Sequence, residues 1–438
     1  MRFNFKNYLS NPFVLLKLYR EFGKDMYEDQ GVIEKKSFTK LKKLCIYCNE
    51  HVPYYRQLFS EIGFRPEEMK RIEDFKRIPI MNKDVVREHF QELQSDEIKK
   101  MNTVLCSTSG STGTPLKIYL DSNVNRAIFC KLWRLWEQEP AWHIGKTLLT
   151  IDGDNVELAN KKWYFNPKNR FLYFIPFHMK RSNIQMYYDV VKKYNPKIMK
   201  GYPSAIYAFG KYLESADLKL EFKTIFIHSE NLLEFQRDFF EKFFRSKVVV
   251  QYGNNEKAGL IYGCQNGRLH SQDDYAFHEI LDKEGNDSPI GEEGRLVCTN
   301  LYNYAMPLLR YDTRDLANFD DIQCNCGSHF RVVKNITGRA SDVIHTKDGR
   351  IVSLIDSAFW KCDNIEMAHI YQPEKGKMVV YLVPAKNYSK DDEDTLMEGL
   401  VERCGSTMEI EIKYVKSSEI PRTPAGKVRF IISEVKSN

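Results

Sequence analysis

The sequence predicts an α/β fold: a large domain of mixed β-sheets flanked by helices, followed by a small α+β domain. Three observations support this. Residues 1 to about 100 show mainly helical periodicity, and from Thr103 onward short apolar runs alternate with helical patterns. Such alternation is typical of βαβ units with a mostly parallel sheet. Beyond Gly338 the pattern changes to a smaller α+β portion, so we expect domains at 1–338 and 339–438.

The individual elements follow from hydrophobic period and from flanking turns. In the larger domain we expect helices at 205–213 and 233–244, and buried strands at 224–228 and 247–252. Several strands with Gly and Pro turns are expected between 276 and 319. In the smaller domain the sequence predicts strands at 378–383 and 409–415 with a helix at 391–403 between them.

Composition restricts the class of protein. The chain has 438 residues, an apolar share of 42% and a charged share of 28%, which is ordinary for a soluble globular protein. The net charge of +6 is spread along the chain without a compact basic block, which argues against nucleic-acid binding. The apolar run 12–16 is too short for a secretory signal or a membrane span, so we expect a cytoplasmic protein without a transmembrane segment.

Ten cysteines in such a chain argue for reduced thiols rather than disulfides. Cys45 and Cys48 share one face of a helical pattern together with Leu41 and Leu44. Because no strand precedes this pair, we interpret it as part of the core and not as a redox motif.

A loop rich in hydroxyl groups is the strongest local signal. Five hydroxyl residues and two glycines occupy positions 107–113, ahead of Pro115. Glycine lets the backbone approach a ligand closely, and hydroxyl and N–H groups donate to phosphate oxygens. The flanking segments suggest two strands joined as in a hairpin. The alternative is a flexible Ser/Thr/Gly linker, although a linker would be expected between domains rather than between apolar segments.

Four later segments also carry chemical groups, each with a structural alternative. Residues 252–256 lie at the carboxyl end of the predicted strand, where the ring of Tyr252 can stack on a base and the carboxylate of Glu256 can hold Mg²⁺; the alternative is a common turn with an N-cap. Asp315 could accept hydrogen bonds from two ribose hydroxyls, or lie in an exposed charged turn. Arg339 lies at a possible hinge, and Lys427 follows a Pro-rich turn that also reads as a basic surface loop.

Taken in order, the five segments resemble the signatures of the adenylate-forming (acyl-activating) enzyme superfamily. The resemblance covers roughly residues 45–435. Within the superfamily the chain is most similar to the phenylacetate–CoA ligase-like branch, including its members associated with capsular polysaccharide synthesis. The segments that carry this finer resemblance are 52–56, 78–83, 201–204 and 294–301.

The resemblance implies a reaction and a set of nucleotide-binding residues. A carboxylate would attack the α-phosphate of ATP to give an acyl-adenylate and pyrophosphate, with the small C-terminal domain acting as a mobile lid. The β- and γ-phosphates would be held by Thr108, Ser109, Gly110, Ser111, Thr112 and Gly113. The adenine would be lined by Ser229, Glu230 and Asn231 and flanked by Tyr252, and the ribose would be bound by Asp315 and Arg339.

The resemblance also implies the catalytic residues. Glu256 would bind Mg²⁺, and Lys427 would bridge the carboxylate and the α-phosphate. This assignment agrees with electrostatics, because two anions must approach one another and their repulsion has to be neutralised. His178 is a candidate for the acyl pocket, with a helix cap or surface histidine as the alternative.

A second metal site is expected from cysteine and histidine spacing. Cys264 and His270 form one pair, and Cys324 and Cys326 form another, ahead of the predicted hinge. Three thiols and one imidazole are a closed ligand set of the kind that structural Zn²⁺ prefers. The resemblance supports this hypothesis, since some members of the branch carry a comparable zinc. The alternative is four unrelated residues.

The sequence motifs bear on three function classes. The resemblance implies an ATP-dependent ligase that activates a small carboxylic acid and passes the acyl group to CoA, to an amine or to a carrier, with a role in surface polysaccharide biosynthesis. A catalytically inactive nucleotide-binding scaffold is the alternative; the presence of Glu256, Asp315 and Lys427 argues against it. A zinc-dependent interaction module would need the Cys/His set without the ATP signatures.

Overall fold

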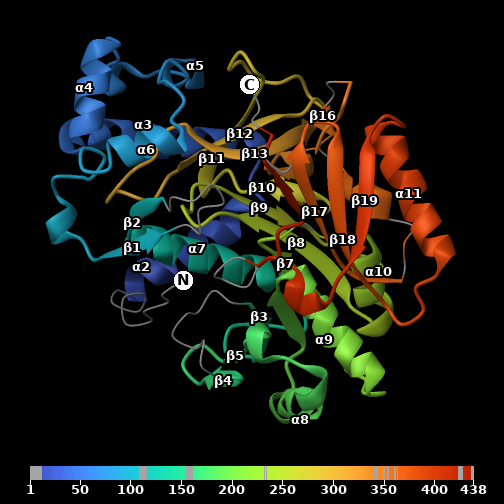
Figure 1. The fold of residues 1–438 in the computed structure, drawn as a ribbon. Coiled ribbons are helices and arrows are strands. Elements are labelled where there is room, and N and C mark those ends of the chain that lie inside the picture. Colours follow the sequence, from blue (N-terminus) through green and yellow to red (C-terminus); the bar gives the residue numbers. More distant parts are fainter. Residues whose placement is uncertain are drawn as a thin grey trace. The chain divides into compact units, whose positions relative to one another are not determined.

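The computed structural model divides into two compact units, each built from two stretches of chain (Figure 1). Unit 1 comprises Met1–Ile144 and Gln251–Ile336, and unit 2 comprises Gly145–Val250 and Thr337–Asn438. The structure describes residues 12–107, 116–152, 161–230, 232, 234–339, 344–348, 351–352, 355–359, 362, 364–422 and 428–435. The division at 338/339 stays a prediction.

Helices dominate the first hundred residues of unit 1, as predicted, within the part that the structure describes. They are α2 (Pro12–Asp25), α3 (Gln30–His51), α4 (Pro53–Glu61), η1 (Pro66–Glu68), α5 (Ile72–Phe75), α6 (Lys83–Glu88) and η2 (Ile98–Lys100), and α7 (Ser122–Trp136) follows. The buried face of α3 contains Leu41, Leu44, Cys45 and Cys48. Both thiols are fully buried, which confirms that they are core residues, and burial raises their pKa.

Strands β1 (Thr103–Ser107) and β2 (Lys117–Asp121) pair antiparallel, with Ser107 opposite Lys117. The hairpin-like flanks predicted for the hydroxyl-rich loop are therefore confirmed. The other strands of unit 1 lie in the order β11 (Ala276–Leu281), β12 (Gly294–Asn300), β13 (Tyr311–Asp320), β14 (Val332–Arg339), β10 (Leu269–Ser271) and β9 (Leu260–Gly263).

Unit 2 contains a sheet whose central strands run parallel. The order is β8 (Lys247–Gly253), β7 (Thr224–His228), β6 (Ile198–Gly201), β3 (Leu148–Ile151), β5 (Phe171–Phe174) and β4 (Trp163–Asn166). The pairs β7–β6, β6–β3 and β3–β5 are parallel, and β4 is antiparallel to β5. The parallel βαβ arrangement predicted from the alternating pattern is thus confirmed.

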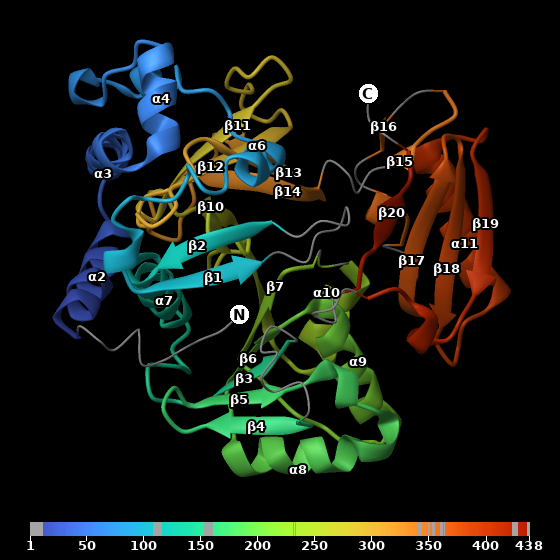
Figure 2. The same cartoon turned by 60° about the vertical axis from the view of Figure 1, so that its left-hand side comes forward.

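Three helices cover one face of this sheet: α8 (Ile184–Tyr194), α9 (Pro203–Ser215) and α10 (Glu234–Phe243) (Figure 2). Alternate strand residues such as Leu149, Met199 and Ile225 join the apolar cluster beneath them. Because side chains alternate between faces along a strand, the residues between them project from the other face. The short helices η4 (Pro176–His178) and η5 (Arg181–Asn183) precede α8.

The C-terminal part of unit 2 has an α+β structure, as predicted. Its sheet has the order β19 (Glu409–Tyr414), β18 (Lys377–Pro384), β17 (Ile365–Glu374) and β20 (Ile431–Ser433). Helix α11 (Lys390–Cys404) lies beside β18 and β19 (Figure 1), and Ser389 caps it by accepting from the backbone N–H of Asp392. Smaller elements are β15 (Ile344–His345), β16 (Ile351–Val352), η6 (Ile355–Phe359) and η7 (Ser417–Glu419).

The observed architecture confirms the α/β class with mixed sheets flanked by helices and a small α+β C-terminal portion. Among the described residues, no helix is both long and apolar enough to cross a lipid bilayer.

Candidate functional site

The structure brings the four predicted zinc ligands together in unit 1. Cys264 follows β9, His270 lies in β10, and Cys324 and Cys326 lie on the loop between β13 and β14. Their ligand atoms all lie within 4.8 Å of one another. The Sγ atoms of Cys264 and Cys324 are 3.6 Å apart, and Cys326 Sγ is 3.5 Å from His270 Nε2. This geometry rules out the reading of four unrelated residues, and the set could hold a metal ion.

The imidazole of His270 is oriented for such a role. Its Nδ1 lies 2.9 Å from the backbone carbonyl of Phe330. Because a carbonyl only accepts, Nδ1 must carry the proton, and the lone pair of Nε2 then faces Cys326. Burial, followed by the neighbouring Cys324 and Cys264, raises the pKa of the Cys326 thiol to about 12. A bound cation would offset the repulsion among the three thiolates.

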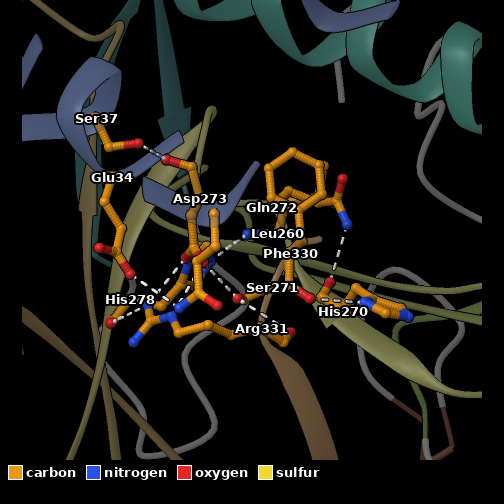
Figure 3. Close-up of polar contacts among 11 residues, drawn as sticks. Glu34, Ser37, Leu260, His270, Ser271, Gln272, Asp273, His278, Phe330 and Arg331 are labelled. Atoms are coloured by element: carbon orange, nitrogen blue, oxygen red, sulfur yellow. Dashed lines mark hydrogen bonds and ion pairs between the residues drawn. The ribbon is translucent and has the colours of Figure 1, made fainter. Parts of the chain in front are cut away.

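A buried polar network continues from this site along the same strands (Figure 3). Arg331 donates to both carboxylate oxygens of Asp273 at 3.0 Å, and His278 Nδ1 lies 3.0 Å from the Oδ1 atom. The other ring nitrogen of His278 accepts from the backbone N–H of Leu260 at 3.2 Å. Burial raises the pKa of Asp273, but Arg331 and His278 lower it more, so the carboxylate stays ionised. The network ties β9, β10, β11 and the start of β14 together.

Glu256 lies in the turn between β8 and β9 and exposes only 5% of its surface. The phenol of Tyr311 donates to its Oε1 at 2.9 Å, and Lys83 Nζ lies 3.5 Å from the same oxygen. Burial first, and then Glu256, raises the pKa of Tyr311, so the phenol stays a donor. Among the described residues no protein group bonds to Oε2, which leaves this oxygen available to a ligand.

Lys83 was not assigned a role from the sequence, where it appeared only as the end of a segment similar to the phenylacetate–CoA ligase-like branch. It is the first residue of α6, whose N-cap Asn82 accepts from two backbone N–H groups. Met81, the residue before Asn82, donates its backbone N–H to the carbonyl of Arg310 at 2.9 Å and accepts from the N–H of Asp312 at 2.8 Å. No local pattern signals this placement, because it depends on pairing with a distant segment.

Arg310 anchors the segment 76–81, which leads into α6. Its guanidinium makes two bonds to Glu279, at 3.1 and 2.9 Å, and two to the carbonyls of Lys76 and Ile78, at 2.6 and 2.7 Å. Arginine presents donors in a fixed fork that suits this bidentate geometry. The clamp fixes the start of β13 and, through Met81, the position of Lys83.

Tyr252 and Asp315, the residues predicted to flank adenine and bind ribose, are neighbours in unit 1. Tyr252 lies in β8, Asp315 lies in β13, and the phenol donates to the Oδ2 atom of the carboxylate at 2.5 Å. Burial and then Asp315 raise the pKa of Tyr252, so the phenol remains protonated. The ring is thereby fixed against the carboxylate that is expected to meet the ribose.

In unit 2, Ser229 and Glu230 follow β7 directly. Ser229 has a φ of 71°. Residues other than glycine seldom adopt this left-handed backbone conformation, and it occurs at functional sites. Glu230 accepts from the N–H and hydroxyl of Ser204 at 3.2 and 3.1 Å and from the N–H of Val428 at 2.9 Å. The side chain of Glu230 therefore braces this turn.

His178 ends η4 and is half-buried; its carbonyl accepts from Asn183 at 2.8 Å. Its place in an acyl pocket stays a prediction. Arg339 closes β14, with its backbone alone described. The other predicted site residues lie outside the described residues; these are Thr108, Ser109, Gly110, Ser111, Thr112, Gly113, Asn231 and Lys427.

The chain is similar in sequence to several curated proteins. It is 24% identical to Protein CapK of Staphylococcus aureus over 96% of this chain and 93% of CapK. It is 25% identical to the phenylacetate-coenzyme A ligase of Thermus thermophilus over 70% of each chain. CapK and phenylacetate-coenzyme A ligases are therefore among its homologues. Residues 344–434 match the family model of the CapK C-terminal domain.

Solved structures give the same fold. The 2-hydroxyisobutyryl-CoA ligase in the postadenylation state, in complex with R3-HIB-AMP, has a TM-score of 0.75 at 19% identity, covering 94% of this chain and 91% of that chain. The anthranilate CoA ligase in complex with anthranoyl-AMP has a TM-score of 0.50 at 14% identity, covering 74% and 65%. The resemblance to adenylate-forming enzymes inferred from the sequence is thus confirmed, and the fold is theirs.

Proposed function

We propose that this protein activates a carboxylic acid with ATP, forming an acyl-adenylate and pyrophosphate, and then transfers the acyl group to CoA. Homology to phenylacetate-coenzyme A ligases supports the reaction class. The observation that carries the proposal is the carboxylate of Glu256. It is buried, and within the described part of the chain its partners reach Oε1 and not Oε2; it lies in the turn that follows Tyr252, the partner of Asp315.

Each residue then has a task that follows from its position. Glu256 would hold Mg²⁺ through its open oxygen, and Mg²⁺ supplies neutralising charge to the phosphates. Tyr311 and Lys83 keep the carboxylate in one place, 2.9 and 3.5 Å from Oε1. Asp315 would accept from the ribose hydroxyls, and Lys427 would offset the repulsion between the carboxylate and the α-phosphate.

The acceptor and the pathway are finer parts of the proposal. We favour CoA over an amine or a carrier, because several homologues are coenzyme A ligases. Similarity to CapK, together with the match of residues 344–434 to the CapK C-terminal domain, supports a role in surface polysaccharide biosynthesis.

ATP–pyrophosphate exchange across a panel of carboxylic acids, with and without CoA, tests the reaction. We expect exchange with at least one acid, thioester formation when CoA is added, and loss of exchange in Lys427→Ala with an unchanged melting temperature. Nucleotide binding without exchange for any acid would support the alternative, an inactive scaffold. Normal exchange in Lys427→Ala would contradict the role of that lysine.

We also propose that Cys264, His270, Cys324 and Cys326 hold a structural Zn²⁺, because three thiols and one imidazole with a fixed tautomer match its preferred tetrahedral set. Elemental analysis of purified protein should give about one zinc per chain. Cys324→Ser should lose the metal and unfold at a lower temperature. Cys298→Ser, which changes a buried thiol outside the set, is the control that keeps the metal.

A further inference from the structure

A second cluster of ionisable side chains lies in unit 2, and the proposed chemistry does not use it. Asp152 directly follows β3, Lys200 lies in β6, and His228 ends β7. Lys200 Nζ donates to Asp152 Oδ2 at 3.1 Å, and His228 Nε2 lies 3.6 Å from the same oxygen. The hydroxyl of Thr150 also donates to Oδ2, at 2.8 Å.

The cluster lies on a defined face and edge of the sheet. Thr150 in β3 is opposite Lys200 in β6, so the two side chains project from the same face. The residues that alternate with them, Leu149, Ile151 and Met199, belong to the apolar cluster under α8, α9 and α10. The polar groups therefore project from the opposite face, at the carboxyl ends of parallel strands. Open α/β sheets bind their ligands at this edge.

The oxygens of Asp152 are used unequally. All three of its contacts fall on Oδ2, and among the described residues no donor reaches Oδ1. Yet the Asp152 side chain exposes only 4% of its surface, and Lys200 exposes 16%. Burial raises the pKa of Asp152, but Lys200 and His228 lower it more, so the carboxylate is charged. An ionised acceptor that no described protein group bonds can accept a hydrogen bond from a ligand.

Lys200 complements this acceptor. An ammonium has three N–H donors, and within the described chain Nζ donates to Asp152 alone. An open acceptor thus lies beside open donors. A second carboxylate on the ligand would be repelled by Asp152, and an ammonium would be repelled by Lys200. A hydroxyl suits both, because it donates to the one and accepts from the other.

We propose that Asp152 and Lys200 are specificity-determining residues that bind a hydroxyl group on the carboxylic acid, which makes the preferred substrate a hydroxy acid. This inference rests on the proposed acid activation. It is supported by position, since His228 of the cluster directly precedes Ser229 and Glu230 of the candidate adenine-lining turn, and its Nδ1 lies 3.0 Å from the Ser229 hydroxyl. Glu256 offers a parallel: it too is buried, with one oxygen held and the other open.

The test is ATP–pyrophosphate exchange with acids that differ by one hydroxyl: glycolate against acetate, lactate against propionate, and mandelate against phenylacetate. Alanine and malonate supply the charged counterparts. We expect at least one hydroxy acid to exceed its deoxy partner in kcat/KM by about 10- to 100-fold, the contribution of hydrogen bonds to charged groups. Equal or better use of every deoxy acid, of alanine or of malonate would overturn the inference.

Variants separate recognition from stability. Asp152→Asn and Lys200→Met should lower kcat/KM for the hydroxy acid by about 10- to 100-fold and leave the deoxy acid within a few fold, collapsing the preference. Arg245→Gln, which breaks an exposed pair with Glu221, should keep it. Melting temperatures are recorded for each variant. An equal loss for both acids, or a lower melting temperature with the preference intact, would assign the cluster a structural role. Absence of exchange with every acid would instead refute the proposed function.

Discussion

Asp273 in unit 1 and Asp152 in unit 2 have similar surroundings but differ in how their two oxygens are used. Each is buried beside a histidine and a cation, and each has its pKa raised by burial but lowered more by those neighbours. Asp273 accepts on both oxygens, from Arg331 and His278 and from the hydroxyl of Ser271. In the part of the chain that the structure describes, the contacts of Asp152 all fall on Oδ2. We infer that Asp273, with both oxygens occupied, stabilises the scaffold, and that the open oxygen of Asp152 accepts from a ligand.

Glu279, a buried carboxylate with both oxygens bonded to Arg310, gives the test with the largest expected effect on the scaffold. Arg310→Met leaves Glu279, 2% exposed in its side chain, without its partner. Removing one member of a buried pair costs about 3–5 kcal/mol, because the other charge stays buried. Urea unfolding should show this loss. Arg245→Gln, in the exposed pair with Glu221, should change stability by less than about 1 kcal/mol. Similar losses in both variants would refute the scaffold role.

The second largest expected effect is on how the free energy of unfolding depends on pH, through Asp273. Its folded pKa is lowered, so its stabilisation is present above the unfolded pKa and is lost as pH falls from there through the folded value. Asp273→Asn should cost about 1–3 kcal/mol at neutral pH and flatten the acid side of the stability profile. Unfolding free energies between roughly pH 7 and pH 3 measure both. An unchanged slope would mean that another carboxylate controls acid unfolding.

The sequence predicted elements best where the signal is local. The strand at 224–228 coincides with β7, and the helix predicted at 391–403 lies within α11, because period and capping are properties of neighbouring residues. The metal-ligand set was proposed from residue types, but its geometry depends on the pairing of β10 with β14, where Leu269 meets Val333. Such long-range register has no local signature.

The residues that the sequence did not assign share one property: their partners are distant in the chain. Asp152 meets Lys200 and His228 only because three parallel strands align their carboxyl ends. In the sequence alone, each of the three is an ordinary ionisable residue near the end of a strand. Chemical types can therefore be read from the sequence, whereas the oxygen that stays open is visible only in three dimensions.

The smallest expected effect concerns Lys83, which lies beside Glu256, the other carboxylate with an open oxygen. At 3.5 Å from Glu256 Oε1 it screens the carboxylate without occupying the open Oε2. Lys83→Met should leave Tyr311 bonded to Oε1, so the fold should persist and Glu256 should stay positioned. With one cation removed, the carboxylate attracts Mg²⁺ more strongly, and the half-saturating Mg²⁺ concentration in pyrophosphate exchange should fall by a few fold. Lys100→Met, in an exposed pair with Glu97, is the control. A rise in the Mg²⁺ requirement would instead mean that Lys83 itself helps to bind the phosphates and belongs to the ligand site rather than to its support.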